Sequence, residues 1–336
     1  MGGMRTAFGE SFDVPVGYLN TASSGIPPVA ATRAVIDRVR RWSAGGERDA
    51  AHVPEADDAR AAFGRLVGVP HDRVALGATV SQLVAGIATG LPDDASVVVA
   101  EGDFTSLTAP LAARGLRITE VPLVDVADAA PGHDLVAVSV AQSADGRLVD
   151  LDGLRTCGVP VLLDASQAVG WLPLSAAWAD YVVAVGYKFL LAPKGTAWLA
   201  MSEAALARGV PVTANWFAGE DRRASMYGLP VGLASSARRF DITPAPFAQT
   251  GAAVTLPWLA ALDREAVRDH VVGLADRLRA GLGLGPGGTA IVSVPASAER
   301  LAAAGVTSSA RAGRVRLSFH LYNTVEDVDL VLEALT

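Results

Sequence analysis

Lysine is almost missing from this chain of 336 residues: Lys188 and Lys194 are its only lysines, and arginine supplies the rest of its 28 basic side chains. A guanidinium stays protonated at any workable pH, whereas a desolvated ε-amine can lose its proton and attack a carbonyl carbon. The two lysines lie in one segment, VAVGYKFLLAPKGTAWL. Codon usage alone would explain a general loss of lysine, so the flanking residues must decide whether this segment is chemically special.

Cysteine is represented by Cys157 alone, which excludes an intramolecular disulfide and a zinc cluster built from several cysteines. No apolar run reaches the ~18 residues that a membrane span requires, and the first residues lack the pattern of a secretory signal. The net charge is −7 and there is no basic tract, which argues against nucleic acid or an anionic membrane as the main partner. We therefore expect a cytoplasmic protein.

Apolar material is plentiful, because 51% of the residues are hydrophobic and 19% are charged. Such a chain can bury a large core in one big domain or two closely associated ones. Short apolar runs alternate with helical spacing, which predicts a doubly wound α/β fold with a mostly parallel sheet. Strands are predicted over 96–100, 116–122, 135–140, 159–164, 180–185 and 196–201, and helices over 27–42, 57–68, 79–91 and 106–115.

The pattern changes after about residue 205. An irregular, arginine-rich stretch leads to a helical pattern over 248–283, with a break predicted at Pro257, and then to the strands AIVSVP and RVRLSFHL and the helix EDVDLVLEAL. This order indicates a smaller α+β domain that the N-terminal segment joins. We predict a large α/β domain of residues 21–235 and a small domain formed by residues 1–20 and 236–336.

Two chemically active side chains follow neighbouring predicted strands. Asp164 ends the strand over 159–164, and Lys188 follows the strand over 180–185. Open α/β sheets bind ligands at the carboxyl ends of their strands, so this acid and this amine are expected to face one pocket. A carboxylate buried there needs a positive partner. A structural salt bridge between the two would have the same pattern.

The same pair also meets the needs of pyridoxal 5'-phosphate, which requires an amine for its aldehyde and an anion that keeps its ring nitrogen protonated. The cofactor needs a phosphate site as well. Gly77, Ala78 and Thr79 are predicted to form a turn that opens a helix, and the free N–H groups of a helix N-terminus suit a dianion. Taken alone, such a turn is equally typical of an ordinary helix cap.

Six segments together resemble the class V aminotransferase superfamily of fold-type I pyridoxal phosphate enzymes. That superfamily includes cysteine desulfurases, carbon-sulfur lyases, kynureninases and isopenicillin N epimerase-like proteins. The segments follow the family's order through nearly the whole chain: YLNTASSGIPP, GATVSQL, DASQ, GYKFLLAPKGT, RRFDITP and RVRLSFHLYNTVEDVD. The resemblance implies a large cofactor-binding domain, a smaller C-terminal α+β domain, an amino acid as small-molecule substrate, and a homodimer with the active site at the subunit boundary.

The resemblance also implies roles for single residues around the cofactor ring. Lys188 would carry pyridoxal phosphate as a Schiff base and move the Cα proton, and Asp164 would pair with the pyridinium nitrogen. Gln167 would contact the phenolic oxygen. Phe104 would stack on the ring, with a packed core aromatic as the alternative. Either Gln142 or Ser143 would contact a cofactor oxygen.

The phosphate is assigned in the same way to Gly77, Thr79, the backbone of Ala78 and the side chain of Tyr187. Thr243 would reach the phosphate of the other subunit, although Ile242 replaces the family's usual glycine beside it. Lys194 is expected to be a loop residue near the phosphate rather than a catalyst.

Arg316 is the predicted ligand of the substrate α-carboxylate, because a planar guanidinium can hold a carboxylate through two hydrogen bonds. Asn20 would line the same pocket. The rival arginines are each more typical of a surface or an interface: Arg238, Arg239, Arg311 and Arg314. No metal site is expected, since the histidines lack ligand spacing, and we expect His320 to be structural.

One departure from the family bears on the reaction. Desulfurases that carry a persulfide need a cysteine shortly before the terminal Arg-x-Ser motif, and this chain reads GVTSSARAGRVRLSF there. Cys157 precedes an apolar strand and is expected to be packed. We therefore favour a carbon-sulfur lyase or desulfurase-like β-elimination without a persulfide cysteine.

Three other outcomes stay open. Transamination and epimerisation share the first proton abstraction with β-elimination. A non-catalytic relative that lost the cofactor is the alternative of another class. A buried acid and amine without a function would be costly, which argues against that relative.

Overall fold

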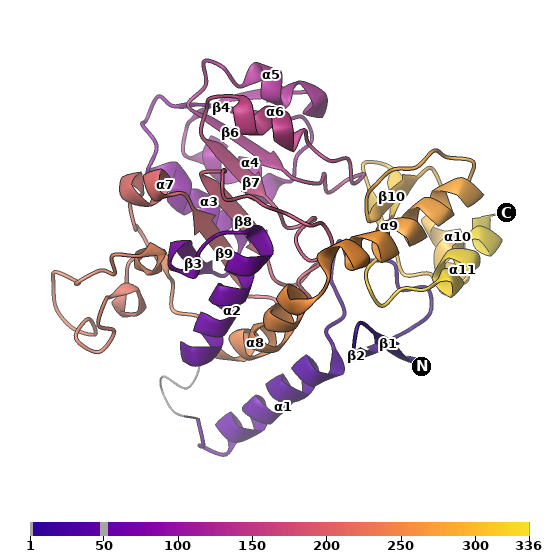
Figure 1. The fold of residues 1–336 in the computed structure, drawn as a ribbon, viewed down its shortest axis with the longest axis horizontal. Helices are drawn as coiled ribbons and strands as arrows, with labels where there is room; N and C mark the ends of the chain where they lie inside the picture. The colour runs from indigo at the N-terminus through magenta and orange to yellow at the C-terminus, as the bar shows by residue number, and fades with distance from the viewer. Residues whose placement is uncertain (1–2, 48–52, 336) are drawn as a thin grey trace.

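A seven-stranded sheet forms the centre of the protein (Figure 1). The computed structural model describes residues 3–47 and 53–335. The strands lie in the order β3-β9-β8-β7-β6-β4-β5. All of them run in one direction except β9, which is antiparallel to both β3 and β8. Their bounds are Val74–Gly77 (β3), Ser96–Ala100 (β4), Arg117–Val121 (β5), Leu135–Ser139 (β6), Val161–Asp164 (β7), Tyr181–Val185 (β8) and Ala197–Met201 (β9). This mostly parallel sheet confirms the predicted α/β class.

Helices cover both faces of this sheet, so its strands are apolar on both sides. One face packs against α2 (Val53–Val67), α5 (Val126–Ala129), α6 (Leu151–Thr156) and α8 (Pro246–Ala261). The other packs against α3 (Val80–Thr89), α4 (Thr105–Ala113) and α7 (Glu203–Arg208). In β4, for example, Val98 belongs to the first core and Val97 and Val99 to the second. Burial on both faces explains why the sequence revealed β4, β6, β7, β8 and β9 as continuous apolar runs, whereas β5 is a largely exposed edge strand with the β-branched pattern RITEV.

Strand β3 was not predicted. It has only four residues and ends in a glycine, so its apolar run is too short to stand out. Short 3-10 turns join several elements: η1 (His71–Arg73), η2 (Leu123–Asp125), η3 (Trp216–Ala218) and η4 (Ala237–Phe240). Of these, η4 packs against β3.

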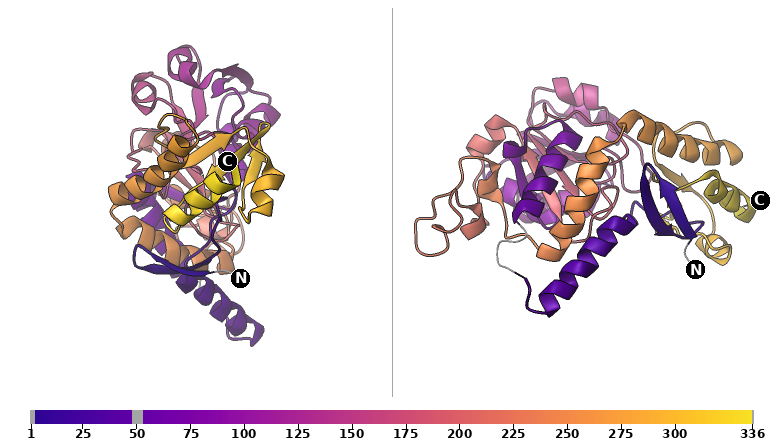
Figure 2. Two further views of the ribbon diagram at one scale, coloured as in Figure 1. Left: turned by 90° about the vertical axis from the view of Figure 1, so that its right-hand side faces the viewer. Right: turned by 60° about the horizontal axis from the view of Figure 1, so that its bottom comes forward.

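A second, smaller unit is built around a three-stranded sheet in the order β10-β12-β11, with bounds Ile291–Val294, Arg314–Ser318 and Ser309–Arg311. Its helices are α9 (Arg264–Gly281), α10 (Ala298–Ala303) and α11 (Val325–Leu335). The N-terminal hairpin of β1 (Gly3–Ala7) and β2 (Glu10–Val14) lies near this unit in both views of Figure 2. Bridges from Tyr18 to Thr307 and from Asn20 to Ser318 join the N-terminal segment to the unit.

The predicted domain boundary at residue 236 stays a prediction. Helix α8, which follows it, packs against α1 (Val29–Ser43) and α2. Residues 1–2, 48–52 and 336 of the two predicted domains lie outside the described residues.

The break predicted at Pro257 was wrong. Helix α8 continues through Pro257, and the chain breaks at Leu262, after which Asp263 caps α9 by accepting hydrogen bonds from the N–H groups of Glu265 (3.1 Å) and Ala266 (3.2 Å). Buried leucines on both sides of Pro257 pack in the core of the large sheet, and this packing outweighs the hydrogen bond that proline cannot donate.

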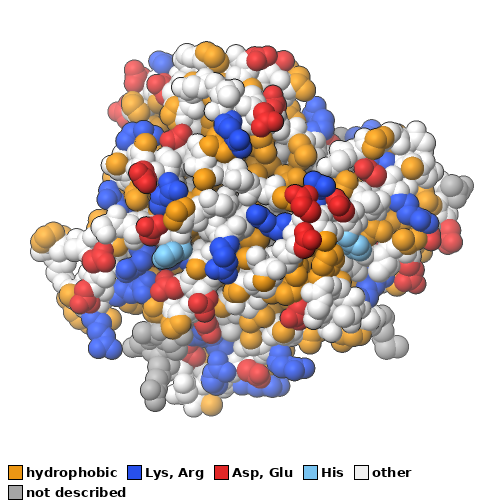
Figure 3. All heavy atoms as spheres, in the orientation of Figure 1, with side chains coloured by type: hydrophobic (Ala, Val, Ile, Leu, Met, Phe, Trp, Pro, Cys, Tyr) orange, Lys and Arg blue, Asp and Glu red, His pale blue; other side chains and the backbone are white. Residues whose placement is uncertain are grey.

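The surface agrees with the net charge of −7 and with the lack of a basic tract in the sequence. On the face that Figure 3 shows, acidic and basic side chains are interspersed, and no extended basic area appears. None of the helices in the described residues combines the length and the apolarity that crossing a membrane requires.

Candidate active site

Five segments that follow parallel strands meet at one edge of the large sheet, because the carboxyl ends of parallel strands lie together. The turn of residues 77–79 follows β3, Phe104 follows β4, residues 142–143 follow β6, Asp164 ends β7, and Lys188 follows β8. The register places Ser139 of β6 opposite Asp164. The predicted site residues of the large unit therefore share one edge.

Lys188 is buried at this edge, with 6% of its surface exposed. Its Nζ lies 5.1 Å from the centre of the Phe104 ring and 5.9 Å from that of Tyr187. Desolvation lowers the pKa of Lys188 to about 8; the charge of Asp164 opposes this shift, and Arg316 adds to it. A substantial fraction of this amine is therefore neutral close to physiological pH, as a nucleophile or a general base requires.

Gly25 approaches the backbone of Lys188 so closely that no side chain fits there. Its N–H donates to the carbonyl of Tyr187 at 2.8 Å, and an added Cβ would lie 2.2 Å from the carbonyl oxygen of Lys188. Sequence reasoning missed this contact. Its only signal was a glycine within the YLNTASSGIPP motif.

Asp164 is buried beside the lysine. Burial raises its pKa, the charge of Lys188 and hydrogen bonds from Ser166 oppose that shift, and the nearby Asp103 raises the pKa further. Its Oδ1 accepts from the Ser166 N–H at 2.8 Å, and the Ser166 hydroxyl accepts from the Val185 N–H at 3.1 Å, which ties the ends of β7 and β8 together. A cation facing Asp164 would offset the cost of its burial.

Phe104 is held by Asp103, a residue that the sequence analysis missed. The Asp103 carboxylate accepts from the Phe104 N–H at 2.7 Å and from the N–H and hydroxyl of Ser139 at 2.8 and 2.5 Å. Phe104 is 38% exposed, which excludes the alternative of a packed core aromatic. Its stacking on a cofactor ring stays a prediction.

Arg316 enters the site from β12 of the smaller unit, and it is 1% exposed. It donates to the carbonyl and hydroxyl of Ser143 at 2.6 and 3.1 Å, to the hydroxyl of Ser23 at 2.7 Å and to that of Ser309 at 3.1 Å. Burial lowers its pKa to about 10, and the charge of Arg311 adds to the shift.

All of these acceptors are neutral oxygens, and no salt bridge to Arg316 occurs in residues 3–47 and 53–335. A buried guanidinium without an acidic partner is suited to bind an anionic ligand.

Gln167 connects the two parts of the site, because its Nε2 donates to the carbonyl of Ala22 at 3.1 Å and to the Ser143 hydroxyl at 3.3 Å. Its Oε1 is buried without a hydrogen-bond partner, as are Oδ1 of Asn20 and Nε2 of Gln142, as far as the structure describes the chain. Such atoms cost free energy unless a ligand satisfies them. Two of these atoms are acceptors and one is a donor, so they fit a ligand that carries both hydrogen-bond donors and acceptors.

The predicted phosphate turn opens helix α3 as expected. Thr79 caps the helix, with its hydroxyl accepting from the Gln82 N–H at 3.2 Å, and the Ala78 N–H donates to Gln82 Oε1 at 3.1 Å. An added Cβ at Gly77 would lie 2.6 Å from Leu83. The turn thus lies at a helix N-terminus, where a phosphate can bind, and Gln82 Oε1 occupies the Ala78 N–H that was assigned to the phosphate.

Lys194 and Thr243 are the two other residues that were predicted near the phosphate, and both have exposed side chains. Lys194 is exposed, and its Nζ lies 5.4 Å from the ring centre of the half-buried Tyr187. Thr243 is exposed as well and donates to Asn215 Oδ1 at 3.1 Å, so its role toward another subunit stays a prediction.

The remaining predictions concern four rival arginines, of which Arg311 lies near enough for its charge to lower the pKa of Lys188 and of Arg316, together with His320 and a metal site. The rivals Arg238 and Arg239 are half-buried, and Arg311 and Arg314 are exposed. His320 is fully buried, and its Nε2 lies 2.9 Å from the carbonyl oxygen of Phe189. No cluster that could hold a metal occurs among the described residues.

Cys157 is half-buried and precedes β7, whereas Asp164 ends that strand. The lone thiol therefore belongs to the opposite edge of the sheet from Lys188.

Comparison with known proteins decides the family. The profile of the family "Aminotransferase class-V" matches residues 20–304. The chain belongs to this family. A curated relative, the "Uncharacterized aminotransferase YcbU" of Bacillus subtilis (strain 168), is 27% identical over 308 residues, which cover 82% of each chain.

Solved structures share the fold at low identity. The apo cysteine desulfurase of Thermococcus onnurineus NA1 has a TM-score of 0.81 and 19% identity, with 95% of this chain and 93% of that one covered. The cystine C-S lyase C-DES in complex with cysteine persulfide has a TM-score of 0.82 and 18% identity, with 94% and 96% covered.

Family membership confirms the predicted enzyme class and cofactor: this class V aminotransferase-like chain is a pyridoxal phosphate-dependent enzyme that acts on an amino acid. The residues present fit the cofactor, because they combine a buried amine, an opposed carboxylate and a helix N-terminus. The non-catalytic alternative is thereby set aside.

Proposed function

We propose that this enzyme is a carbon-sulfur lyase that eliminates a sulfur leaving group from Cβ of an amino acid without using a persulfide cysteine. The bound cofactor would supply an electron sink for the Cα carbanion. In the net reaction the Cα–H and Cβ–S bonds break, and water converts the remaining carbon skeleton into a 2-oxo acid and ammonia.

The geometry of the site supports the following roles for the chain's own residues. Arg316 would exchange serine hydroxyl partners for the α-carboxylate, bind it through two hydrogen bonds and orient the Cα–H bond toward Lys188, whose neutral amine would take the proton. Asp164 would hold a proton on the ring nitrogen by its negative charge, and Phe104 would cover one face of the ring. The observation that carries this proposal is the buried guanidinium of Arg316, which has only neutral oxygens as partners.

The choice of β-elimination rests on the thiol. Cys157 is the only cysteine in the sequence, and it lies before the start of β7. A relay that carries sulfur on a cysteine would need that thiol at the other edge of the sheet. The C-S lyase with the same fold is named for cystine, which favours a disulfide or thioether amino acid as the substrate class.

Transamination is the second candidate, because the curated relative is named an aminotransferase. Measuring 2-oxo acid release from L-cystine, with and without an added 2-oxo acid as amino acceptor, separates the two reactions. Release without an acceptor supports elimination, and strict dependence on an acceptor contradicts it. Cys157→Ala should retain full activity, and its inactivity would reveal a persulfide relay.

We further propose a cytoplasmic homodimer. A cavity of about 380 Å³ is lined by Tyr187 and Lys194 together with residues of α1, including Val35 and Ile36. Helix α1 extends along one side of the molecule in Figure 1, and Ile36, Val39 and Trp42 on it are 45, 40 and 56% exposed. A second copy that covers this surface would bury it beside the phosphate region.

A further inference from the structure

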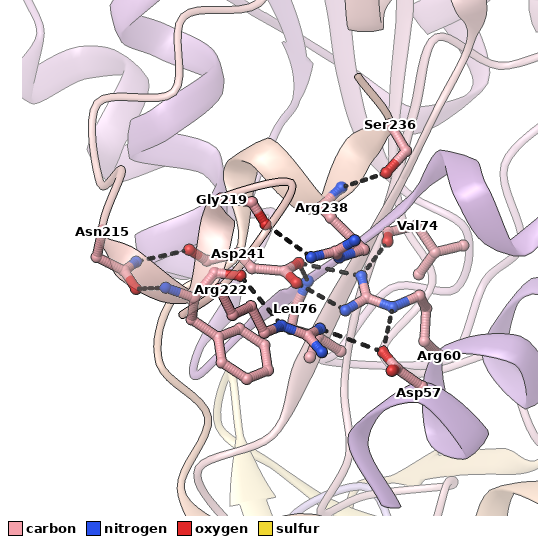
Figure 4. A network of polar contacts seen from close by, with 11 residues as sticks. Asp57, Arg60, Val74, Leu76, Asn215, Gly219, Arg222, Ser236, Arg238 and Asp241 are labelled. Carbon is pink, nitrogen blue, oxygen red and sulfur yellow. Dashed lines mark hydrogen bonds and ion pairs between the residues drawn. The ribbon is translucent and has the colours of Figure 1, made fainter. Parts of the chain in front are cut away.

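Within the described residues, the outer edge of β3 is bonded by residues 241–242 instead of another strand, and Figure 4 shows Asp241 beside Leu76. The Leu76 N–H donates to Asp241 Oδ1 at 2.8 Å, and the Ile242 N–H donates to the Leu76 carbonyl at 3.2 Å. Strand β3 leads directly into the turn of residues 77–79. These two hydrogen bonds therefore hold the residue that precedes the predicted phosphate turn.

Asp241 is itself held by a buried, bidentate ion pair with Arg60 of α2. Arg60 donates to Oδ1 at 3.0 Å and to Oδ2 at 2.7 Å, and it also donates to the carbonyl of Val74 at 2.5 Å. Arg60 is 2% exposed and Asp241 is fully buried. The pair thus contacts β3 at its first residue, Val74, and at its third, Leu76.

A buried ion pair is weak evidence for a gain in stability, since two apolar side chains of similar volume often serve as well. Its hydrogen bonds do fix geometry. Outside the pair, Arg60 bonds to the Val74 carbonyl and Asp241 accepts from the Leu76 N–H, both in β3. Asp57 forms ion pairs with Arg60 and with Arg222 beside them (Figure 4).

The same segment leads to Thr243. The backbone carbonyl of Asp241 accepts from Asn215 Nδ2 at 2.8 Å, and Asn215 Oδ1 accepts from the Thr243 hydroxyl at 3.1 Å. Thr243 lies two residues after Asp241, so fixing Asp241 also limits where Thr243 can lie.

We propose that Asp241 is a positioning residue for the cofactor phosphate, which fixes the turn of residues 77–79 through Leu76 and fixes Thr243 through the adjoining backbone. This inference rests on the proposed function. In the proposed dimer, one carboxylate would then position phosphate ligands for two active sites, its own through the turn and the other subunit's through Thr243.

The test compares two aldehydes that differ only in the phosphate. Apo-protein carrying Asp241→Asn is titrated with pyridoxal phosphate and with pyridoxal, and the absorbance of the lysine adduct gives each dissociation constant. We expect pyridoxal phosphate to bind about tenfold more weakly than to the wild type, the order expected for one lost charge-assisted hydrogen bond. Pyridoxal should bind unchanged. Equal weakening of both aldehydes, or of neither, would overturn the proposal.

Asp327→Asn is the matched control. Asp327 is also fully buried, pairs with Arg5 through two hydrogen bonds of 2.6 and 3.1 Å, and accepts from the Gly17 N–H at 2.7 Å, but it lies in the smaller unit. Its loss should lower stability without changing the ratio of the two dissociation constants. A control that changes this ratio as Asp241→Asn does would show a general loosening and contradict the proposal.

Arg60→Lys provides a second variant if Asp241→Asn does not fold. It retains the positive charge beside Asp241 and removes the fork that reaches Val74. Inorganic phosphate should raise the melting temperature of the wild-type apo-protein, and we expect Arg60→Lys to lose this rise. A variant that keeps the rise would overturn the proposal. A wild-type protein that binds pyridoxal but gains nothing from the phosphate contradicts this inference alone, whereas one that binds neither aldehyde contradicts the proposed function as well.

Discussion

Desolvation is what makes single residues of this site reactive. Lys188 is 6% exposed and has a pKa of about 8, so about a tenth of the amine is neutral at pH 7. At the ordinary pKa of 10.5 the neutral fraction would be far below one in a hundred. Arg316 keeps its charge despite its burial, because a pKa of about 10 still leaves it protonated. One buried cation can thus act as a nucleophile while the other binds an anion.

The lowered pKa of Lys188 predicts a pH profile. The neutral amine is the reactive form, so the rate at which the apo-protein captures pyridoxal should rise about tenfold per pH unit and level off above about pH 8. Stopped-flow absorbance measures this rate. A rate that still rises between pH 9 and 10 would contradict the shift. Lys188→Ala, which retains Lys194, should show no such phase.

The fork of Arg316 predicts a selective loss of substrate binding. Arg316→Lys keeps a positive charge but cannot form two parallel hydrogen bonds with a carboxylate, so we expect KM to rise roughly 10–100-fold. Steady-state kinetics with a sulfur-bearing amino acid measures the effect. The control is Arg314→Lys on the same strand, where the exposed guanidinium donates to the Ser293 carbonyl at 3.0 Å. Equal changes in both variants would argue against the assignment.

At the scale of elements, close approaches between segments position the reactive residues. The loop after β8 carries Lys188, and the segment with Gly25 packs directly on its backbone. Residue Leu191, in the same loop, has a φ of 53°, a left-handed conformation that is uncommon for such a side chain. The packing of neighbouring segments holds this loop in a conformation that its own residues would rarely adopt.

Gly25→Ala tests this approach. The added Cβ would lie 2.2 Å from the Lys188 carbonyl oxygen, so the loop must move, and we expect a loss of cofactor binding and about 1–3 kcal/mol of stability. Cofactor absorbance and urea unfolding measure the two effects. Gly86→Ala in α3, where an added Cβ meets nothing within 4 Å, should instead be neutral or raise stability by about 0.5–1 kcal/mol. Unchanged cofactor binding in Gly25→Ala would refute the positional role.

The sequence alone predicted most clearly the strands whose side chains are buried on both faces of the sheet. Strands β4 and β6 to β9 are covered on both faces and appear as apolar runs, β5 is a largely exposed edge strand that was predicted from its β-branched residues, and β3 is short and was missed. Lys188 and Asp164 could be found because Asp164 ends such a run and Lys188 follows another. Asp103 and Gly25 could not, since their importance comes from contacts between segments far apart in the chain. For the same reason the packing around Pro257 could not be foreseen.

At the scale of the whole molecule, the catalytic edge lies where the two units meet. Arg316 comes from the smaller unit and Lys188 from the larger one, and Ser23 of the N-terminal segment contacts Arg316. A site assembled from three distant parts of the chain requires the complete fold. In the proposed dimer, a second copy would bury the exposed apolar surface of α1 beside this site.

The proposed dimer predicts a change in mass. Ile36→Glu places a charge on the exposed apolar face of α1 beside the cavity lined by Tyr187, and we expect dissociation into monomers with weaker cofactor binding. Sedimentation velocity measures the assembly. Val124→Glu is the matched control, since Val124 is 74% exposed in η2, and it should stay dimeric. A monomeric wild-type protein would contradict the proposal.

The most direct test of the central claim uses the scarcity of lysine. Only Lys188 and Lys194 offer an ε-amine, so borohydride reduction of the protein loaded with pyridoxal phosphate, followed by peptide mass spectrometry, has two lysines to distinguish. We expect the reduced cofactor on Lys188 alone. Labelling of Lys194, or of neither lysine, would contradict the assignment of the buried amine as the residue that carries the cofactor.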